Sequence, residues 1–70
     1  MKRKPVESSN ILAVGYNREK AQLEIEFKRS KVVYKYFDVP ANVHRNLMKA
    51  ESIGSYFNQN IAKEYEFVRL

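Results

Sequence analysis

The sequence predicts an α+β fold in which a small antiparallel sheet, made of three N-terminal strands and one C-terminal strand, is covered by one or two helices. Residues 23–27 alternate apolar and acidic side chains, as in a half-buried strand. Residues 43–61 place apolar side chains at helical spacing, and residues 65–70 return to a strand-like pattern. We expect a single domain over residues 1–70, with residues 1–5 as a flexible basic terminus.

Composition limits the classes of protein that fit. The chain has 70 residues, of which 44% are hydrophobic, so one core can form and roughly 60% of the unfolded surface can be buried. The absence of cysteine excludes disulfides and thiolate metal sites. No apolar run approaches the roughly 20 residues of a membrane span, and no signal-peptide core follows the first basic residues. We expect a soluble, cytoplasmic protein without membrane contacts.

The first two strands are expected to form a hairpin. Residues 11–16 (ILAVGY) predict one strand, and residues 17–20 are polar and suit a short loop. The second strand covers residues 23–27 (LEIEF), where apolar residues alternate with Glu24 and Glu26. This two-residue period is the clearest strand signal in the chain.

The third strand contains the motif Tyr34-Lys35-Tyr36, and its register against the second strand decides where the rings point. A two-residue turn at residues 29–30 places both tyrosines on the apolar face and Lys35 opposite Glu24. A three-residue turn would reverse the faces and expose the tyrosines. The pairs expected with the shorter turn are Phe27 with Val32, Ile25 with Tyr34, and Leu23 with Tyr36.

A first helix is predicted over residues 41–50. Pro40 suits its first turn, and Asp38 just upstream can cap free backbone amides. One side of this helix is apolar and is expected to cover the sheet. The other side leaves His44, Arg45 and Lys49 towards solvent.

A second helix is predicted over residues 55–63, after an interruption at Gly54. Ser55 is a candidate N-cap, and Phe57 and Ile61 share an inward face. The predicted core draws on both helices and all four strands. Its members are Leu12, Val14, Leu23, Ile25, Phe27, Val32, Tyr34, Tyr36, Val43, Leu47, Phe57, Ile61 and Phe67.

The ordered blocks SSNILAVGY, LEIEF, VYKYFDVP, LMKAESIGSYFNQNI and YEFVRL resemble the KTSC domain over residues 6–70. This family is a small bacterial module that occurs alone or at the C-terminal end of some lysyl-tRNA synthetases. Its central Tyr-x-Tyr is matched by Tyr34-Lys35-Tyr36, and residues 51–58 resemble its stretch with glycine and an aromatic before asparagine. The resemblance implies no catalytic residue, and it implies RNA binding through the synthetase association.

Enzymatic chemistry has little support in the residues. The only histidine is His44, placed on a solvent face, and no motif brings a base to a serine nucleophile. One histidine and no thiols leave no metal-ligand spacing. We therefore expect a protein that is not an enzyme and that has no catalytic, cofactor-binding or metal-binding residues.

Basic charge points instead towards polyanions. The net charge is +5, and Lys2, Arg3 and Lys4 supply three of these charges. A mobile cationic arm can contact phosphates without fixed geometry. A merely disordered terminus on a mildly basic surface explains the same charge equally well.

Two further segments are candidates for binding nucleic acid. An exposed Phe37 beside Lys35 could stack on a base, unless a helix covers that face, and the two tyrosines are either core or a second stacking platform. Ser52, Gly54 and Ser55 open a helix whose free amides could hold a phosphate, with Lys49 close by. The alternative is that a serine caps this helix and Gly54 supplies an unusual backbone angle.

These observations favour a non-catalytic binding module for RNA or other single-stranded nucleic acid. The alternative is a protein interaction or self-association module that uses an exposed sheet edge or the Val33 and Phe37 surface. The residues predicted to contact nucleic acid are Lys2, Arg3, Lys4, Lys35, Phe37, Lys49, Ser52, Gly54 and Ser55.

Overall fold

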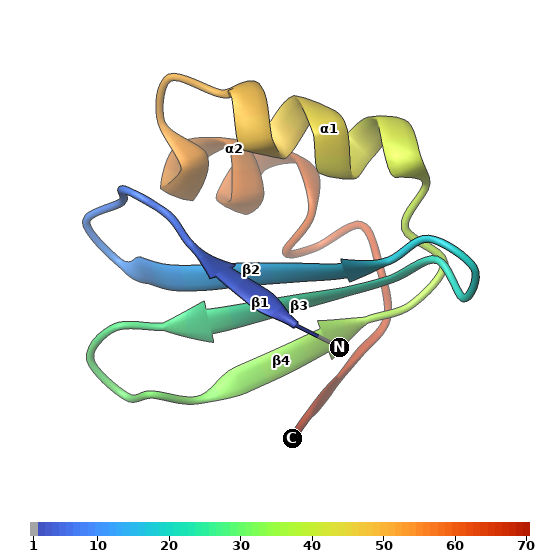
Figure 1. Cartoon of the computed structure of the whole chain (residues 1–70), viewed down its shortest axis with the longest axis horizontal. Coiled ribbons are helices and arrows are strands. Elements are labelled where there is room, and N and C mark those ends of the chain that lie inside the picture. The colour runs from blue at the N-terminus through green and yellow to red at the C-terminus, as the bar shows by residue number, and fades with distance from the viewer. Residues whose placement is uncertain (1) are drawn as a thin grey trace.

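Both helices lie on the same face of a five-stranded antiparallel sheet in the computed structural model, which describes residues 2–70 (Figure 1). The elements in chain order are β1 (Arg3–Pro5), β2 (Ile11–Asn17), β3 (Gln22–Phe27), β4 (Val33–Tyr36), α1 (Ala41–Lys49), α2 (Ile53–Asn60) and β5 (Phe67–Arg69). The strands follow each other across the sheet in this same order. The α+β class is confirmed, but the prediction of four strands is one too few.

The additional strand is β1, which falls in the segment expected to be a flexible terminus. Met1 lies outside the described residues, whereas Arg3–Pro5 pair antiparallel with β2. The Arg3 guanidinium donates hydrogen bonds to Glu24 at 2.6 Å and to Glu26 at 3.2 Å. Ion pairs with β3, two strands away, therefore help to hold β1 in place, and no local sequence pattern reveals them.

The predicted register of the β3–β4 hairpin is confirmed. Ile25 lies opposite Tyr34 and Glu24 opposite Lys35, so both tyrosines lie on the core side of the sheet, where Tyr36 contacts Phe57 of α2. The connection is longer than the predicted two-residue turn, because Lys31 adopts a left-handed conformation with φ of 57° and its N–H donates to the Phe27 carbonyl at 3.0 Å. The loop over residues 28–31 thus keeps the pairing while using four residues.

The core forms where this sheet face meets the two helices. Tyr36 is 3% exposed and belongs to the core, and Tyr34 is half-buried against it. Burial, with a smaller contribution from Tyr34, raises the pKa of Tyr36 to about 12. The buried cluster consists of Ile11, Val14, Leu23, Ile25, Tyr36, Val39, Leu47, Phe57 and Ile61.

Two predicted core residues are exposed. Leu12 retains 37% of its surface because the β2–β3 pairing shifts register between Ile11 and Ala13, and this irregularity turns Ile11 inward instead. Phe67 retains 48% because β5 is an edge strand with β4 as its only neighbour in the sheet. The core also contains Val39, in the connection between β4 and α1, which the sequence patterns did not predict.

The helix ends differ from the predictions in their capping. Pro40 is itself the N-cap of α1 and no side chain caps that helix, so Asp38 does not have the expected role. Helix α2 begins at Ile53 and ends at Asn60, earlier at both ends than predicted. The Ser52 hydroxyl caps it by accepting a hydrogen bond from the Ser55 N–H at 3.2 Å.

Gly54 is required for space rather than for an unusual backbone angle. It lies in the first turn of α2 and does not have a positive φ. A Cβ at this position would lie 2.5 Å from Oδ1 of Asn10. The glycine therefore lets α2 approach the segment that leads into β2.

The helices are short, and none within residues 2–70 combines the length and apolarity that a membrane crossing requires.

Candidate nucleic-acid interface

The predicted nucleic-acid contacts do not form one surface. By register, Arg3 and Lys35 lie on the sheet face opposite the core, whereas Lys4 pairs with the core residue Val14 and lies on the helix side. Ser52, Gly54 and Ser55 lie at the start of α2. The structure thus divides these six predicted residues among three places, while Phe37 follows β4 and Lys49 ends α1.

A row of charged residues crosses the uncovered face of the sheet. The strand registers align Arg3, Gly15, Glu24, Lys35 and Val68, one from each strand. Gly15 has no side chain, so nothing stands between Arg3 and Glu24, which meet at 2.6 Å. On the other side, the Nζ atom of Lys35 lies 3.8 Å from a Glu24 oxygen.

Glu24 is the anion that these cations share, and it is only 5% exposed. Its hydrogen bond with Arg3 is the main reason why the pKa of Arg3 is raised above its ordinary value. The predicted pairing of Lys35 with Glu24 is confirmed. Both cations therefore neutralise a buried carboxylate and are poorly placed to bind phosphates.

Phe37 differs from its predicted exposed setting, and the start of α2 follows one of its two predicted alternatives. Phe37 is half-buried directly after β4, and its N–H donates to the Glu66 carbonyl at 2.9 Å. The hydroxyls of Ser52 and Ser55 lie 3.0 Å apart and are engaged in capping α2. The predicted serine cap is therefore confirmed, whereas the unusual backbone angle expected of Gly54 is wrong.

His44 is not a solvated side chain, contrary to the prediction. It is half-buried, and its ring stacks on Tyr16 with centroids 4.5 Å apart and an interplanar angle of 9°. Burial, and secondly the charge of Lys4, lower the pKa of His44. Arg45 and Lys49 are exposed, as predicted for the outer side of α1.

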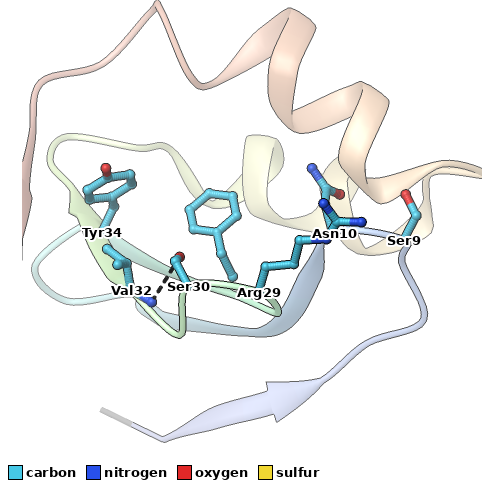
Figure 2. A pocket seen from close by; sticks show the side chains of 7 residues that line it. Ser9, Asn10, Arg29, Ser30, Val32 and Tyr34 are labelled. Atoms are coloured by element: carbon cyan, nitrogen blue, oxygen red, sulfur yellow. Dashed lines mark hydrogen bonds between the residues drawn. The ribbon is translucent and has the colours of Figure 1, made fainter.

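A cleft with chemistry suited to nucleobases lies at the end of the sheet where β2 begins and the β3–β4 loop turns (Figure 2). It has a volume of about 550 Å³, within the range of small-molecule sites. Its lining residues are Ser9, Asn10, Phe27, Arg29, Ser30, Val32 and Tyr34.

The walls of this cleft include two half-buried aromatic rings. Phe27 and Tyr34 meet edge to face with centroids 5.7 Å apart. Phe27 also contacts the buried ring of Phe57 at a centroid distance of 5.7 Å, so the wall is anchored in the core. A flat, apolar ligand can therefore contact ring surface that needs little rearrangement.

Polar groups surround the aromatic wall. Arg29 is exposed in the loop, and the Ser30 hydroxyl accepts a hydrogen bond from the Val32 N–H at 3.2 Å (Figure 2). Ser9 and Asn10 approach from the start of β2. Sequence reasoning missed this site because residues 9–10 and 27–34 meet only through the fold. Tyr34 alone was recognised, as one of two candidate stacking rings.

No group of three or more potential ligands for a metal ion is found among the residues that the structure describes. The cleft offers aromatic, amide, hydroxyl and guanidinium groups, which suit binding by stacking and hydrogen bonds.

The family model for the KTSC domain matches residues 7–65. The chain belongs to the KTSC domain family. This confirms the resemblance drawn from the order of the sequence blocks. Among solved structures, the crystal structure of a KTSC domain protein from Yersinia pestis is 36% identical, with a TM-score of 0.94 over 99% of this chain and 96% of that one.

Curated relatives of this KTSC domain include both short and long proteins. An uncharacterised protein from Stutzerimonas stutzeri is 42% identical over 84% of this chain and 82% of its own length. A protein from Tsukamurella paurometabola is 36% identical over 94% of this chain and 97% of its own length. A lysine–tRNA ligase from Nostoc punctiforme is 39% identical over 91% of this chain, which spans only 11% of the ligase.

Proposed function

We propose that this KTSC domain is a non-catalytic module that binds single-stranded RNA and takes an unpaired base into the cleft between Phe27 and Tyr34. The observation that carries the proposal is an aromatic cleft of about 550 Å³ with Arg29 in its lining. Unpaired bases are recognised by stacking on aromatic rings and by hydrogen bonds to their edges, while cations contact the backbone.

The loop beside the cleft supplies the cations that an RNA backbone needs. Three of its four residues are basic: Lys28, Arg29 and Lys31. The Lys28 ammonium donates to the Ser8 carbonyl. Within residues 2–70, Arg29 and Lys31 have no ion-pair partner. These two side chains are therefore available to phosphates in a way that Arg3 and Lys35 are not.

One relative supports the proposal by its name. A lysine–tRNA ligase, by its name, acts on an RNA, and one such ligase contains a segment similar to nearly the whole of this domain. The chain itself is basic, with a net charge of +5. Neither fact identifies the binding site, which is inferred from the cleft.

We expect Arg29→Gln to weaken binding of a fluorescently labelled, mixed-sequence single-stranded RNA, measured by anisotropy at several salt concentrations. Loss of one phosphate contact should lower the slope of log affinity against log salt by about 0.7. Arg18→Gln is the matched control, because Arg18 is also exposed but lies in the β2–β3 loop and does not line the cleft.

Equal losses for the two variants would assign the binding to net charge alone. Absence of saturable binding by the parent protein would overturn the proposal. If the proposal is correct, titration of isotope-labelled protein with this RNA should shift backbone amide signals around Phe27, Arg29 and Tyr34.

Self-association through β5 is the second candidate function. The large hydrophobic residues that are exposed within the described chain are Leu12, Phe67, Val68 and Leu70, and three of the four lie in or beside β5. Hydrogen bonds join Glu66 and Leu70 to β4, so by alternation the backbone groups of Phe67 and Arg69 face away from the sheet.

A second copy fits this edge without a clash of like charges. Antiparallel pairing of two β5 strands about Val68 places Phe67 opposite Arg69 of the second copy, where a cation can contact a ring. If the domain self-associates in this way, sedimentation should be concentration-dependent, and Val68→Lys should make it monomeric. Leu12→Lys is the control, since it changes another exposed apolar residue, 37% exposed against 46% for Val68, on a different strand. Monomeric parent protein at all concentrations would exclude this alternative.

A further inference from the structure

A second hollow lies on the helix side of the sheet, between β1, β2 and α1. Its volume is about 420 Å³, and none of its residues lines the aromatic cleft. The residues around it are Lys2, Lys4, Val14, Tyr16, His44 and Met48.

This cavity combines an apolar floor with cationic sides. Val14 is buried in the core and Met48 packs against it. Lys4 lies opposite Val14 in the β1–β2 pairing, whereas its neighbour Arg3 points to the other face and binds Glu24. No carboxylate is present among the lining residues, so the two lysines face the cavity without a neutralising anion there.

His44 is held in the cavity by its aromatic neighbour. Its ring stacks on Tyr16, and the Tyr16 hydroxyl donates to the Val39 carbonyl at 2.6 Å, which fixes the tyrosine ring. Burial chiefly, and the charge of Lys4 secondly, lower the pKa of His44, so the neutral imidazole is favoured.

We propose that this cavity binds a phosphate monoester dianion, held by the ammonium groups of Lys2 and Lys4 and by the imidazole of His44. A doubly charged oxyanion supplies the negative charge that the lining lacks, and its oxygens accept hydrogen bonds from ammonium and imidazolium groups. This site is separate from the RNA cleft and does not depend on it.

Anion binding and His44 protonation must be linked. An anion beside the ring favours the imidazolium, so it raises the pKa of His44 towards or above its ordinary value. By reciprocity, the protonated protein binds the anion more tightly by the same factor. Affinity for a dianion of constant charge is therefore expected to increase as the pH falls through the titration of His44, whereas a phosphate monoester loses part of this gain because its own second pKa is about 6. The charged groups that line the cavity beside the imidazole are Lys4 from β1 and Lys2 just before it, and the ring of Tyr16 stacks on the imidazole from β2.

His44 is the only histidine in the sequence, so its imidazole signals in an NMR titration report on this site alone. The titration is recorded with sodium sulfate, a dianion whose charge is constant over the range, and with sodium chloride at equal ionic strength. We expect sulfate to shift the His44 titration to higher pH and to bind about fivefold or more tightly at pH 5.5 than at pH 7.5, the lower end of typical couplings. An unchanged titration in sulfate would overturn the proposal.

Two variants separate a defined site from general charge. Lys4→Gln should raise the pKa of His44 without any anion, because a repulsive cation is removed, and should weaken the response to sulfate. Lys63→Gln removes the same charge from an exposed position after α2 and should change neither property. Equal behaviour of the two variants would overturn the proposal.

The source of the phosphate is distinguished by two further ligands. A short RNA with a 5′-phosphate that shifts His44 at concentrations where the 5′-hydroxyl form does not would identify a nucleic-acid end as the ligand. A shift with inorganic phosphate but with neither RNA would identify a small phosphorylated molecule. Arg29 does not line this cavity, so Arg29→Gln tests RNA binding by the aromatic cleft and leaves the His44 titration unchanged. The two proposals can therefore fail independently of each other.

Discussion

Leu47→Ala is expected to destabilise the domain by about 3–5 kcal/mol, most of the stability that a chain of this length can have. Leu47 is fully buried and belongs to the cluster between α1 and the sheet. Its truncation loses the transfer free energy of the side chain and leaves a cavity beneath a helix of only nine residues. Urea unfolding followed by far-ultraviolet circular dichroism would give the difference in free energy, or would show that the variant does not fold.

Leu12→Ala is the matched control for this substitution. Both leucines were predicted to be core residues, but Leu12 is 37% exposed because of the irregular pairing near Ile11. Its truncation should cost less than about 1 kcal/mol, as is typical of positions away from the core. Similar losses for the two variants would mean that the β2 register described above is wrong.

Glu24→Gln should lower the free energy of unfolding by about 2 kcal/mol, because it removes the anion shared by two cations. The side chains of Arg3 and Lys35 are 31% and 26% exposed, so water can only partly replace the lost carboxylate. The loss should appear first in β1, whose arginine binds this residue. Hydrogen exchange of the amides in residues 3–5 would show faster local opening than in β2 or β3.

Glu26→Gln tests whether the effect belongs to the shared position of Glu24. Glu26 also binds Arg3, but at 3.2 Å and with a side chain that is 22% exposed. Its replacement leaves Arg3 and Lys35 with Glu24, so we expect a loss below about 1 kcal/mol. A larger loss of stability for Glu26→Gln than for Glu24→Gln would contradict the conclusion that Glu24 is the main partner of Arg3 and Lys35.

The alternation of apolar and charged residues was enough to predict the β3–β4 hairpin, but not the features that depend on contacts between distant segments. The β3–β4 register was predicted from the alternation around Glu24 and from a two-residue turn at residues 29–30, and the resulting pairing of Lys35 with Glu24 is confirmed although the loop is longer. Strand β1 could not be found in this way, because Lys-Arg-Lys-Pro resembles a solvated terminus and its partners Glu24 and Glu26 are distant in sequence. The sequence indicated that Gly54 interrupts the helical region. The glycine is needed because Asn10 packs against it, a contact that is seen only in the folded structure.

The candidate sites were less predictable than the fold. Charge and aromatic content pointed towards polyanions. Lys35 and Phe37 were chosen because they lie in or beside the Tyr-Lys-Tyr motif, but neither lines the aromatic cleft. Residues around the aromatic cleft come from two separated segments, and the lining of the second cavity from three elements. His44 was assigned to solvent because its helical position lies beside Arg45, and the stacking ring of Tyr16 reaches it from another strand.

The agreement between chain order and sheet order has a consequence for how such a domain is joined to others. The first and last strands, β1 and β5, are the two rims of the sheet. Polypeptide attached before or after the domain therefore leaves from its periphery, and no strand has to be threaded between others to make the connection. A domain built in this way can be joined to a long enzyme without a change in its strand order. The segment similar to this chain spans 11% of the Nostoc ligase but 82% of the short Stutzerimonas protein.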